Sequence, residues 1–164
     1  MTVRPDRPPV DPDVDLHVPR QRAELRTGTA SLLAAVAAGG VVGGLARHGL
    51  TAAWPSPPRG FPWATFVVNV SGCLLIGVLM VLVTEVWTAH RLVRPFLGTG
   101  VLGGYTTFST YAVQVQQAVD AGAVRTGLLY LAGTLVAALA AVGAGMAVTR
   151  WLTAGRRSPV GGSG

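Results

Sequence analysis

Four long apolar segments, separated by short polar stretches, dominate the chain. They cover approximately residues 31–50, 63–87, 95–119 and 124–151. Each is close to the roughly 20 residues that an α-helix needs to cross a bilayer. A helix of a soluble bundle would carry one polar face, whereas these segments are apolar on all sides. The pattern predicts an all-α integral membrane domain of four transmembrane helices, occupying residues 29–153.

The two ends of the chain differ from these segments. Residues 1–28 contain five arginines, five acidic residues and several prolines, with no apolar run that could serve as a signal peptide. This composition predicts a disordered N-terminal tail. Residues 154–164 are rich in glycine and predict a flexible C-terminal tail.

The distribution of charge along the chain is more informative than the net charge, because it predicts the orientation of the helices in the membrane. All 13 basic residues are arginine, and the net charge is +6. The arginine content accompanies a general enrichment in alanine, glycine, valine and proline, so we expect no nucleic-acid partner. The side that bears both termini carries Arg20, Arg22, Arg26, Arg91, Arg94, Arg150, Arg156 and Arg157, and the opposite side carries Arg59 and Arg125. Eight arginines against two predict cytoplasmic termini.

Catalytic patterns are absent from the sequence. The single Cys73 excludes a disulfide scaffold, and the three histidines, His17, His48 and His90, lack metal-ligand spacing. Ser109 has no nucleophile-elbow pattern around it. The short loops between the apolar segments leave no room for a separate catalytic domain. We therefore do not expect an enzyme.

Three polar side chains within the first two segments need an explanation, because polar groups are costly in lipid. Arg47, near the end of the first segment, could extend to the membrane interface or supply a fixed positive charge to an anion vestibule. Thr65 and Asn69 are four residues apart in the second segment and share a helix face. They could bond to a neighbouring helix or line a pore.

The third segment is the least regular. In GTGVLGGYTTFSTYAVQ, four glycines precede a run of hydroxyl side chains, a combination unfavourable to an uninterrupted helix. A helix break would free backbone carbonyls, which membrane proteins tolerate when these bind an ion or are buried in protein. The glycines could equally provide close helix packing. Phe108 and Tyr111 lie three apart on one face, where their rings could pack or present positive edges to an anion.

Together these motifs resemble the Fluc (CrcB) family of fluoride channels. The resemblance covers about residues 35–150 and rests on GGVVGGLARH, FPWATFVVNVSGCLLIG and GTGVLGGYTTFSTY in this order. It implies a four-helix subunit with a broken third helix, assembled as an antiparallel dimer of the dual-topology type in the cell membrane. The implied function is a fluoride-specific ion channel that lowers cytoplasmic fluoride by passive export.

The resemblance also implies site residues. Asn69 matches the family's pore asparagine, and Phe108 matches the first ring of a phenylalanine pair. Gly103 and Thr106 match positions whose backbone carbonyls help to bind a structural sodium ion at the dimer centre. The expected fluoride pathway comprises Arg47, Thr65, Asn69, Phe108, Ser109, Thr110, Tyr111, Tyr130 and Thr134.

Two positions depart from the family pattern. Tyr111 replaces the second phenylalanine, and Gln114 replaces the usual glutamate. The Tyr111 hydroxyl could bond to fluoride directly, or it could turn away and leave the second aromatic position defective.

Two other functions fit four short spans: a small multidrug-type cation transporter and a membrane subunit without transport activity. The transporter should carry a membrane-embedded glutamate, whereas the one acid within a span here is Glu85, at the end of the second. The channel's partner could be a second copy or a paralogous subunit. The arginine asymmetry favours one orientation, and hence pairing with an oppositely oriented relative.

Overall fold

The structure is a computed structural model that describes residues 29–57, 59–86 and 91–154. Over these residues the chain is helical and contains no strand. The two tails that the sequence predicts, with their five arginines of the orientation count, lie outside the described residues, apart from Ala154 at the end of the last helix.

Three described helices are long and apolar enough to cross a membrane. They are α2 (Ala30–Ala53), α3 (Trp63–Val81) with its π-helical continuation η2 (Leu82–Val86), and α6 (Val124–Ala154). Proline-rich chain separates α2 from α3, and Gly122, with a φ of 75°, forms the turn before α6. The chain is therefore a helical membrane protein.

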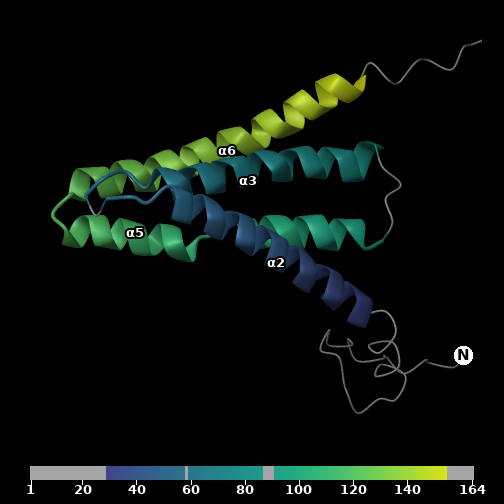
Figure 1. The fold of residues 1–164 in the computed structure, drawn as a ribbon. Coiled ribbons are helices and arrows are strands. Elements are labelled where there is room, and N and C mark those ends of the chain that lie inside the picture. The colour runs from purple at the N-terminus through teal and green to yellow at the C-terminus, as the bar shows by residue number, and fades with distance from the viewer. Residues whose placement is uncertain (1–28, 58, 87–90, 155–164) are drawn as a thin grey trace, which may run out of the picture.

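The third apolar segment consists of shorter helices placed end to end (Figure 1). They are π-helical η3 (Pro95–Leu102), the single turn α4 (Gly103–Tyr105) and α5 (Ser109–Asp120). Between α4 and α5, Thr106 is extended, with φ −77° and ψ 158°. The chain thus leaves the helix at residues 106–107, in the middle of this segment, and Phe108 already returns to helical dihedral angles.

Glycines set the distance between the packed helices. Helix α3 runs along α6 (Figure 1), where Gly145 lies against the Leu74 carbonyl and Gly77 against the Val142 carbonyl. A Cβ at Gly145 would stand 3.1 Å from the Val78 nitrogen and still closer to the Leu74 oxygen. Backbone therefore packs directly against backbone in this pair.

The same principle joins α2 to η3 and α4. The Gly39 Cα would lie 2.9 Å from a Cβ on Gly100, and the Gly40 carbonyl oxygen would lie 2.6 Å from a Cβ on Gly104. A Cβ on Gly43 would likewise overlap the Val101 carbonyl oxygen. Small residues at such spacing allow close van der Waals contact between helices in lipid.

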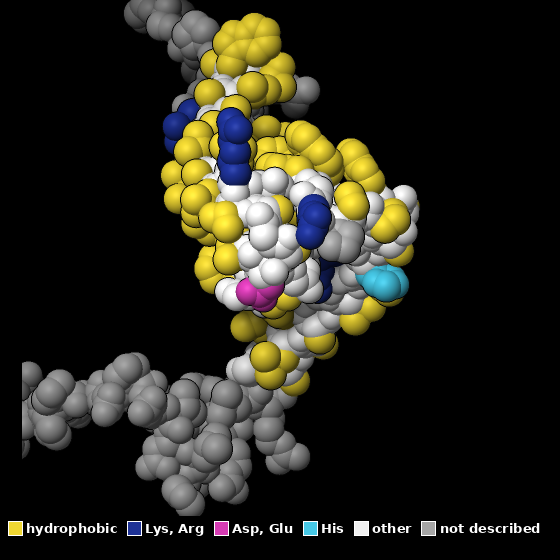
Figure 2. All heavy atoms as spheres, turned by 90° about the vertical axis from the view of Figure 1, so that its left-hand side faces the viewer, with side chains coloured by type: hydrophobic (Ala, Val, Ile, Leu, Met, Phe, Trp, Pro, Cys, Tyr) yellow, Lys and Arg dark blue, Asp and Glu magenta, His cyan; other side chains and the backbone are white. Residues whose placement is uncertain are grey.

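Large apolar side chains cover the outside of the helices. Leu33, Leu45, Leu139 and Trp151 are between 61% and 77% exposed. Charged side chains gather instead at the helix ends, as the view onto the α5–α6 turn shows (Figure 2). This arrangement suits a protein whose flanks contact hydrocarbon and whose ends contact water.

We expect Gly145→Ala to destabilise the protein by about 1–3 kcal/mol, because its methyl group would overlap the α3 backbone. Thermal unfolding in detergent measures the effect. Gly143→Ala is the matched control, since a Cβ there meets no atom within 4 Å. Equal melting temperatures for the two variants would contradict the packing argument.

Candidate functional site

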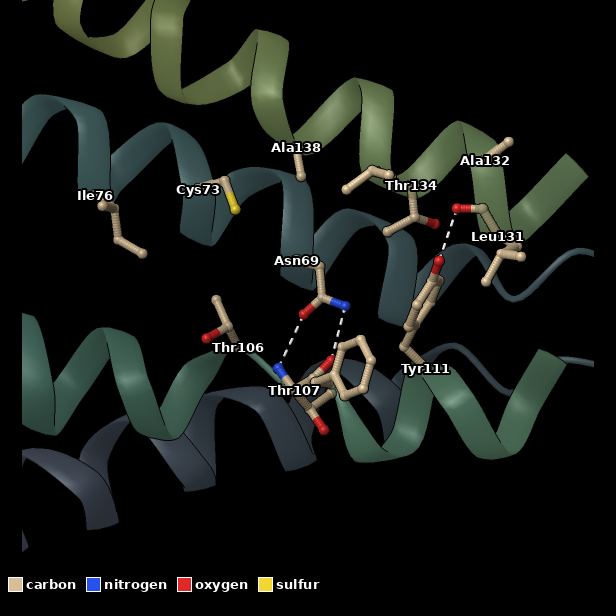
Figure 3. A pocket seen from close by; sticks show the side chains of 12 residues that line it. Asn69, Cys73, Ile76, Thr106, Thr107, Tyr111, Leu131, Ala132, Thr134 and Ala138 are labelled. Atoms are coloured by element: carbon tan, nitrogen blue, oxygen red, sulfur yellow. Dashed lines mark hydrogen bonds between the residues drawn. The ribbon is translucent and has the colours of Figure 1, made fainter. Parts of the chain in front are cut away.

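The interrupted part of the third segment is held by one side chain of α3. Asn69 Nδ2 donates a hydrogen bond to the Thr107 carbonyl oxygen at 2.9 Å, and the Thr107 N–H donates to Asn69 Oδ1 at 2.9 Å (Figure 3). The amide thereby pairs with both polar groups of one non-helical residue. Because an amide nitrogen has two hydrogens, one N–H of Asn69 is left for a further acceptor.

Asn69 faces a groove of about 690 Å³ between α3, α6 and the α4–α5 connection. The groove is mostly apolar. Its lining comprises Asn69, Cys73, Ile76, Thr106, Thr107, Phe108, Tyr111, Leu131, Ala132, Thr134, Leu135 and Ala138 (Figure 3). The Thr134 hydroxyl is buried and has no hydrogen-bond partner among the described residues, so it can still serve an occupant of this groove.

A second pocket, of about 260 Å³, has a different character. It is lined by Gly44, Arg47, His48, Thr51, Thr65, Val68, Thr107, Thr110 and Gln114. Hydroxyl and amide groups dominate this lining, which contains one arginine and no carboxylate. Such a polar pocket favours an anion over a cation. We call it the polar pocket and the larger one the aromatic groove.

Two rings stand beside the aromatic groove. The Phe108 and Tyr111 ring centroids are 5.8 Å apart with an interplanar angle of 51°. Phe108 is 79% exposed, whereas Tyr111 is buried. The Tyr111 hydroxyl donates to the Leu131 carbonyl of α6 at 2.7 Å. This bond directs the hydroxyl away from the Phe108 side and fixes the Tyr111 ring against α6.

A second tyrosine, Tyr130, packs against the ring of Tyr111. Tyr130 is fully buried, and its ring centroid lies 5.1 Å from that of Tyr111 in an edge contact. Its hydroxyl donates to Gln114 Oε1 at 3.0 Å. The contact ties α6 to α5 between the two pockets. Tyr130 itself belongs to neither lining.

The structure divides the side chains that the sequence placed on one pathway. Arg47, Thr65 and Thr110 line the polar pocket, and Asn69, Phe108, Tyr111 and Thr134 line the aromatic groove. Although they share a helix face, Thr65 and Asn69 therefore open into different pockets. Ser109 is exposed and lines neither, but its hydroxyl lies 3.3 Å from that of Thr107.

Other residues of the pockets were not expected from the sequence. Thr107 lines both pockets, Cys73 lies beside Asn69 in the groove, and Thr51 and His48 complete the polar pocket. The adjacent threonines 106 and 107 signalled an irregular backbone, but they gave no sign of which hydroxyl would face which pocket.

The proposed sodium ligands lie at the helix interruption. Gly103 is exposed and Thr106 is extended. The Thr107 N–H, which would bond to the Gly103 carbonyl in a continuous helix, donates to Asn69 instead. The Gly103 carbonyl oxygen therefore lacks this helical partner. A carbonyl oxygen is a hard ligand that suits an alkali cation. Among the described residues, no group of three or more histidine, cysteine or carboxylate side chains could hold a metal ion.

Comparison with known proteins gives a consistent result. Residues 34–146 match the family described as CrcB-like protein, Camphor Resistance (CrcB). The chain is 57% identical over 125 residues to the fluoride-specific ion channel FluC 2 of Streptomyces avermitilis, covering 76% of this chain and 79% of that relative.

Two further relatives extend this similarity. FluC 2 of Nocardia farcinica is 54% identical over 127 residues, covering 77% of this chain and 91% of that relative. FluC 3 of Streptomyces avermitilis is 45% identical over 135 residues, covering 82% and 65% respectively. With its helical membrane fold and this extent of similarity, the chain belongs to the CrcB family.

Proposed function

We propose that the chain forms a fluoride-specific ion channel that lowers cytoplasmic fluoride by passive export. The observation that carries this proposal is the pair of adjoining pockets: a polar pocket with Arg47 and no carboxylate, and a groove with an amide and two aromatic rings. The names of the relatives supply the ion. The proposed pathway breaks no covalent bond and requires no catalytic residue.

Small donors along the two pockets suit a strongly hydrated anion. Fluoride must exchange its water shell for protein groups as it enters. In the polar pocket the Thr65 hydroxyl has no hydrogen-bond partner among the described residues, and Thr110 keeps its hydroxyl hydrogen. In the groove, Asn69 keeps one free N–H. Several weak sites in series allow both entry and exit, as conduction requires. Arg47 raises the local anion concentration without a carboxylate to oppose it.

The aromatic rings contribute their edges, which carry partial positive charge. Phe108 is exposed enough to turn its edge toward an ion in the groove. Tyr111 serves through its ring rather than its hydroxyl, because that hydroxyl is bonded to Leu131. The tyrosine thus keeps an aromatic position where the family pattern has phenylalanine, and we infer that this position is functional.

An antiparallel dimer would complete the channel. The exposed Phe108 and Gly103 lie at the interruption of the third segment, whose carbonyls are available to a second subunit. We propose that the Gly103 and Thr106 carbonyls bind a structural sodium ion at the dimer centre. The ion would fix two interrupted helices together without being transported.

We infer that the partner is an oppositely oriented paralogous subunit rather than a second copy. Eight arginines on the side of the termini, against two on the other, favour insertion in one direction, with both termini cytoplasmic and the plasma membrane as the location. The genome of Streptomyces avermitilis encodes two relatives, FluC 2 and FluC 3, so more than one such chain occurs in one cell.

A cation transporter fits the site less well. Glu85 is exposed at the end of η2, and its carboxylate pairs with Arg150 Nε at 2.9 Å. A carboxylate neutralised there is poorly placed to bind a cationic substrate within the membrane. A subunit without transport activity would not need a pocket lined by Arg47 and several threonine hydroxyls.

Proteoliposomes loaded with fluoride should release it rapidly once a counter-ion pathway is opened, and should retain chloride. Ion-selective electrodes measure both anions. Co-reconstitution with a paralogous chain is the second arm, and we expect greater release than with this chain alone. Absence of fluoride release in both arms would contradict the channel, and proton-coupled cation flux would indicate a transporter.

Loss of the Tyr111 ring should impair conduction. We expect Tyr111→Ala to lower fluoride release about tenfold, because the ring edge and its packing are both removed. Tyr111→Phe is the matched control: it keeps the ring and removes the bond to Leu131, so release should stay near the unmodified rate. Unchanged release from Tyr111→Ala would mean that this ring takes no part in the pathway.

Sodium removal tests the proposed ion site. Protein prepared with a large organic cation in place of sodium should melt at a lower temperature, because the carbonyls at the dimer centre would no longer bind a sodium ion. Adding sodium back should restore the melting temperature, whereas the same ionic strength of the organic cation should not. A melting temperature independent of sodium would exclude a structural role.

A further inference from the structure

Thr107 occupies a position that none of the expected pathway residues shares. It is the one residue common to the linings of the polar pocket and the aromatic groove. Its side chain is buried, and its backbone is held from the groove side by the Asn69 amide. In Figure 3 the Thr107 hydroxyl lies on the side of the backbone away from Asn69. Thr107 therefore separates the two pockets.

The hydroxyl of Thr107 is the centre of a small network. It donates to Thr110 Oγ1 at 3.1 Å and accepts the Thr110 N–H at 3.2 Å. The Ser109 hydroxyl lies 3.3 Å from it, close enough for either atom to donate. The Thr107 hydrogen thus has two neighbouring oxygens to which it can point.

This network aims a donor at the polar pocket. Since Thr110 Oγ1 accepts the hydrogen of Thr107, the hydrogen of Thr110 is left for another acceptor in the pocket that it lines. A hydroxyl that accepts one hydrogen bond becomes a stronger donor of the next. Rotation of the Thr107 hydroxyl toward Ser109 would withdraw this support.

We propose that Thr107 is the residue that separates the two pockets and controls passage between them, its hydroxyl strengthening the Thr110 donor when an anion occupies the polar pocket and releasing it when the anion moves to the groove. This inference rests on the proposed fluoride channel and adds a positioning residue to it. Asn69 contributes from the other side, because it keeps the Thr107 backbone fixed while the hydroxyl rotates.

A purely structural role would predict different behaviour. The bond to Thr107 Oγ1 satisfies the Thr110 N–H, one of the backbone donors left open in the first turn of α5, and losing it would destabilise the start of that helix. Fewer channels would then fold, but each folded channel would conduct as before. Single-channel fluoride current in planar lipid bilayers separates the two roles, because it measures conduction per channel and not the number of channels.

The test uses the full chain, with its partner if conduction requires one. We expect Thr107→Val, which keeps the shape and removes the hydroxyl, to lower the single-channel fluoride current about tenfold through loss of one hydrogen bond that supports an anion. Thr107→Ser should keep the current near the original value. Thr149→Val is the matched control, because that buried hydroxyl donates only to the Gly145 carbonyl of its own helix.

Each outcome decides one question. A reduced current for valine with recovery for serine supports the proposal, and an unchanged current for valine overturns it while the channel itself stands. If Thr107→Val does not fold, Thr107→Ala replaces it in the same comparison, since alanine adds no bulk. No fluoride current from the unmodified protein, alone or with its partner, would overturn the proposed function and this inference with it.

Discussion

Two hydrogen bonds between the Asn69 amide and the Thr107 backbone support the least regular part of the molecule. In a membrane, backbone groups outside a helix must find partners within the protein, because lipid offers none. Asn69 supplies both a donor and an acceptor for this purpose. It thereby allows α4 to end and α5 to begin again inside the bundle, and the two pockets exist because the chain passes between them at that point.

The tyrosines make the neighbouring part of the site rigid. The Tyr111 hydroxyl donates a hydrogen bond to the Leu131 carbonyl, and the Tyr130 hydroxyl donates one to Gln114 Oε1. Neither hydroxyl hydrogen is therefore available to an ion, and the Tyr111 ring keeps one orientation. Gln114, at a position where the resemblance to the family implies a glutamate, leaves the lining of the polar pocket without a carboxylate.

Much of the fold is readable from the run lengths of apolar residues. The segment expected at 31–50 forms Ala30–Ala53, and the one at 124–151 forms Val124–Ala154. The site was harder to predict from the sequence, because helical spacing says which residues share a face but not which residues of another segment lie opposite that face. Thr65 and Asn69 share a face, yet Thr65 lines the polar pocket and Asn69 the aromatic groove, with Thr107 between the two. That separation depends on contacts between segments 38 residues apart, which no local pattern reveals.

The glycine contacts between helices have a consequence for how the protein can adapt to different membranes. Because α3 and α6 meet through backbone at Gly77 and Gly145, their spacing owes little to the leucines and valines on their outer surfaces. Those outer residues set the height of the hydrocarbon-facing band, which must match the thickness of the surrounding bilayer. The band can therefore lengthen or shorten by substitution at the lipid-facing positions while the route through the interior keeps its dimensions.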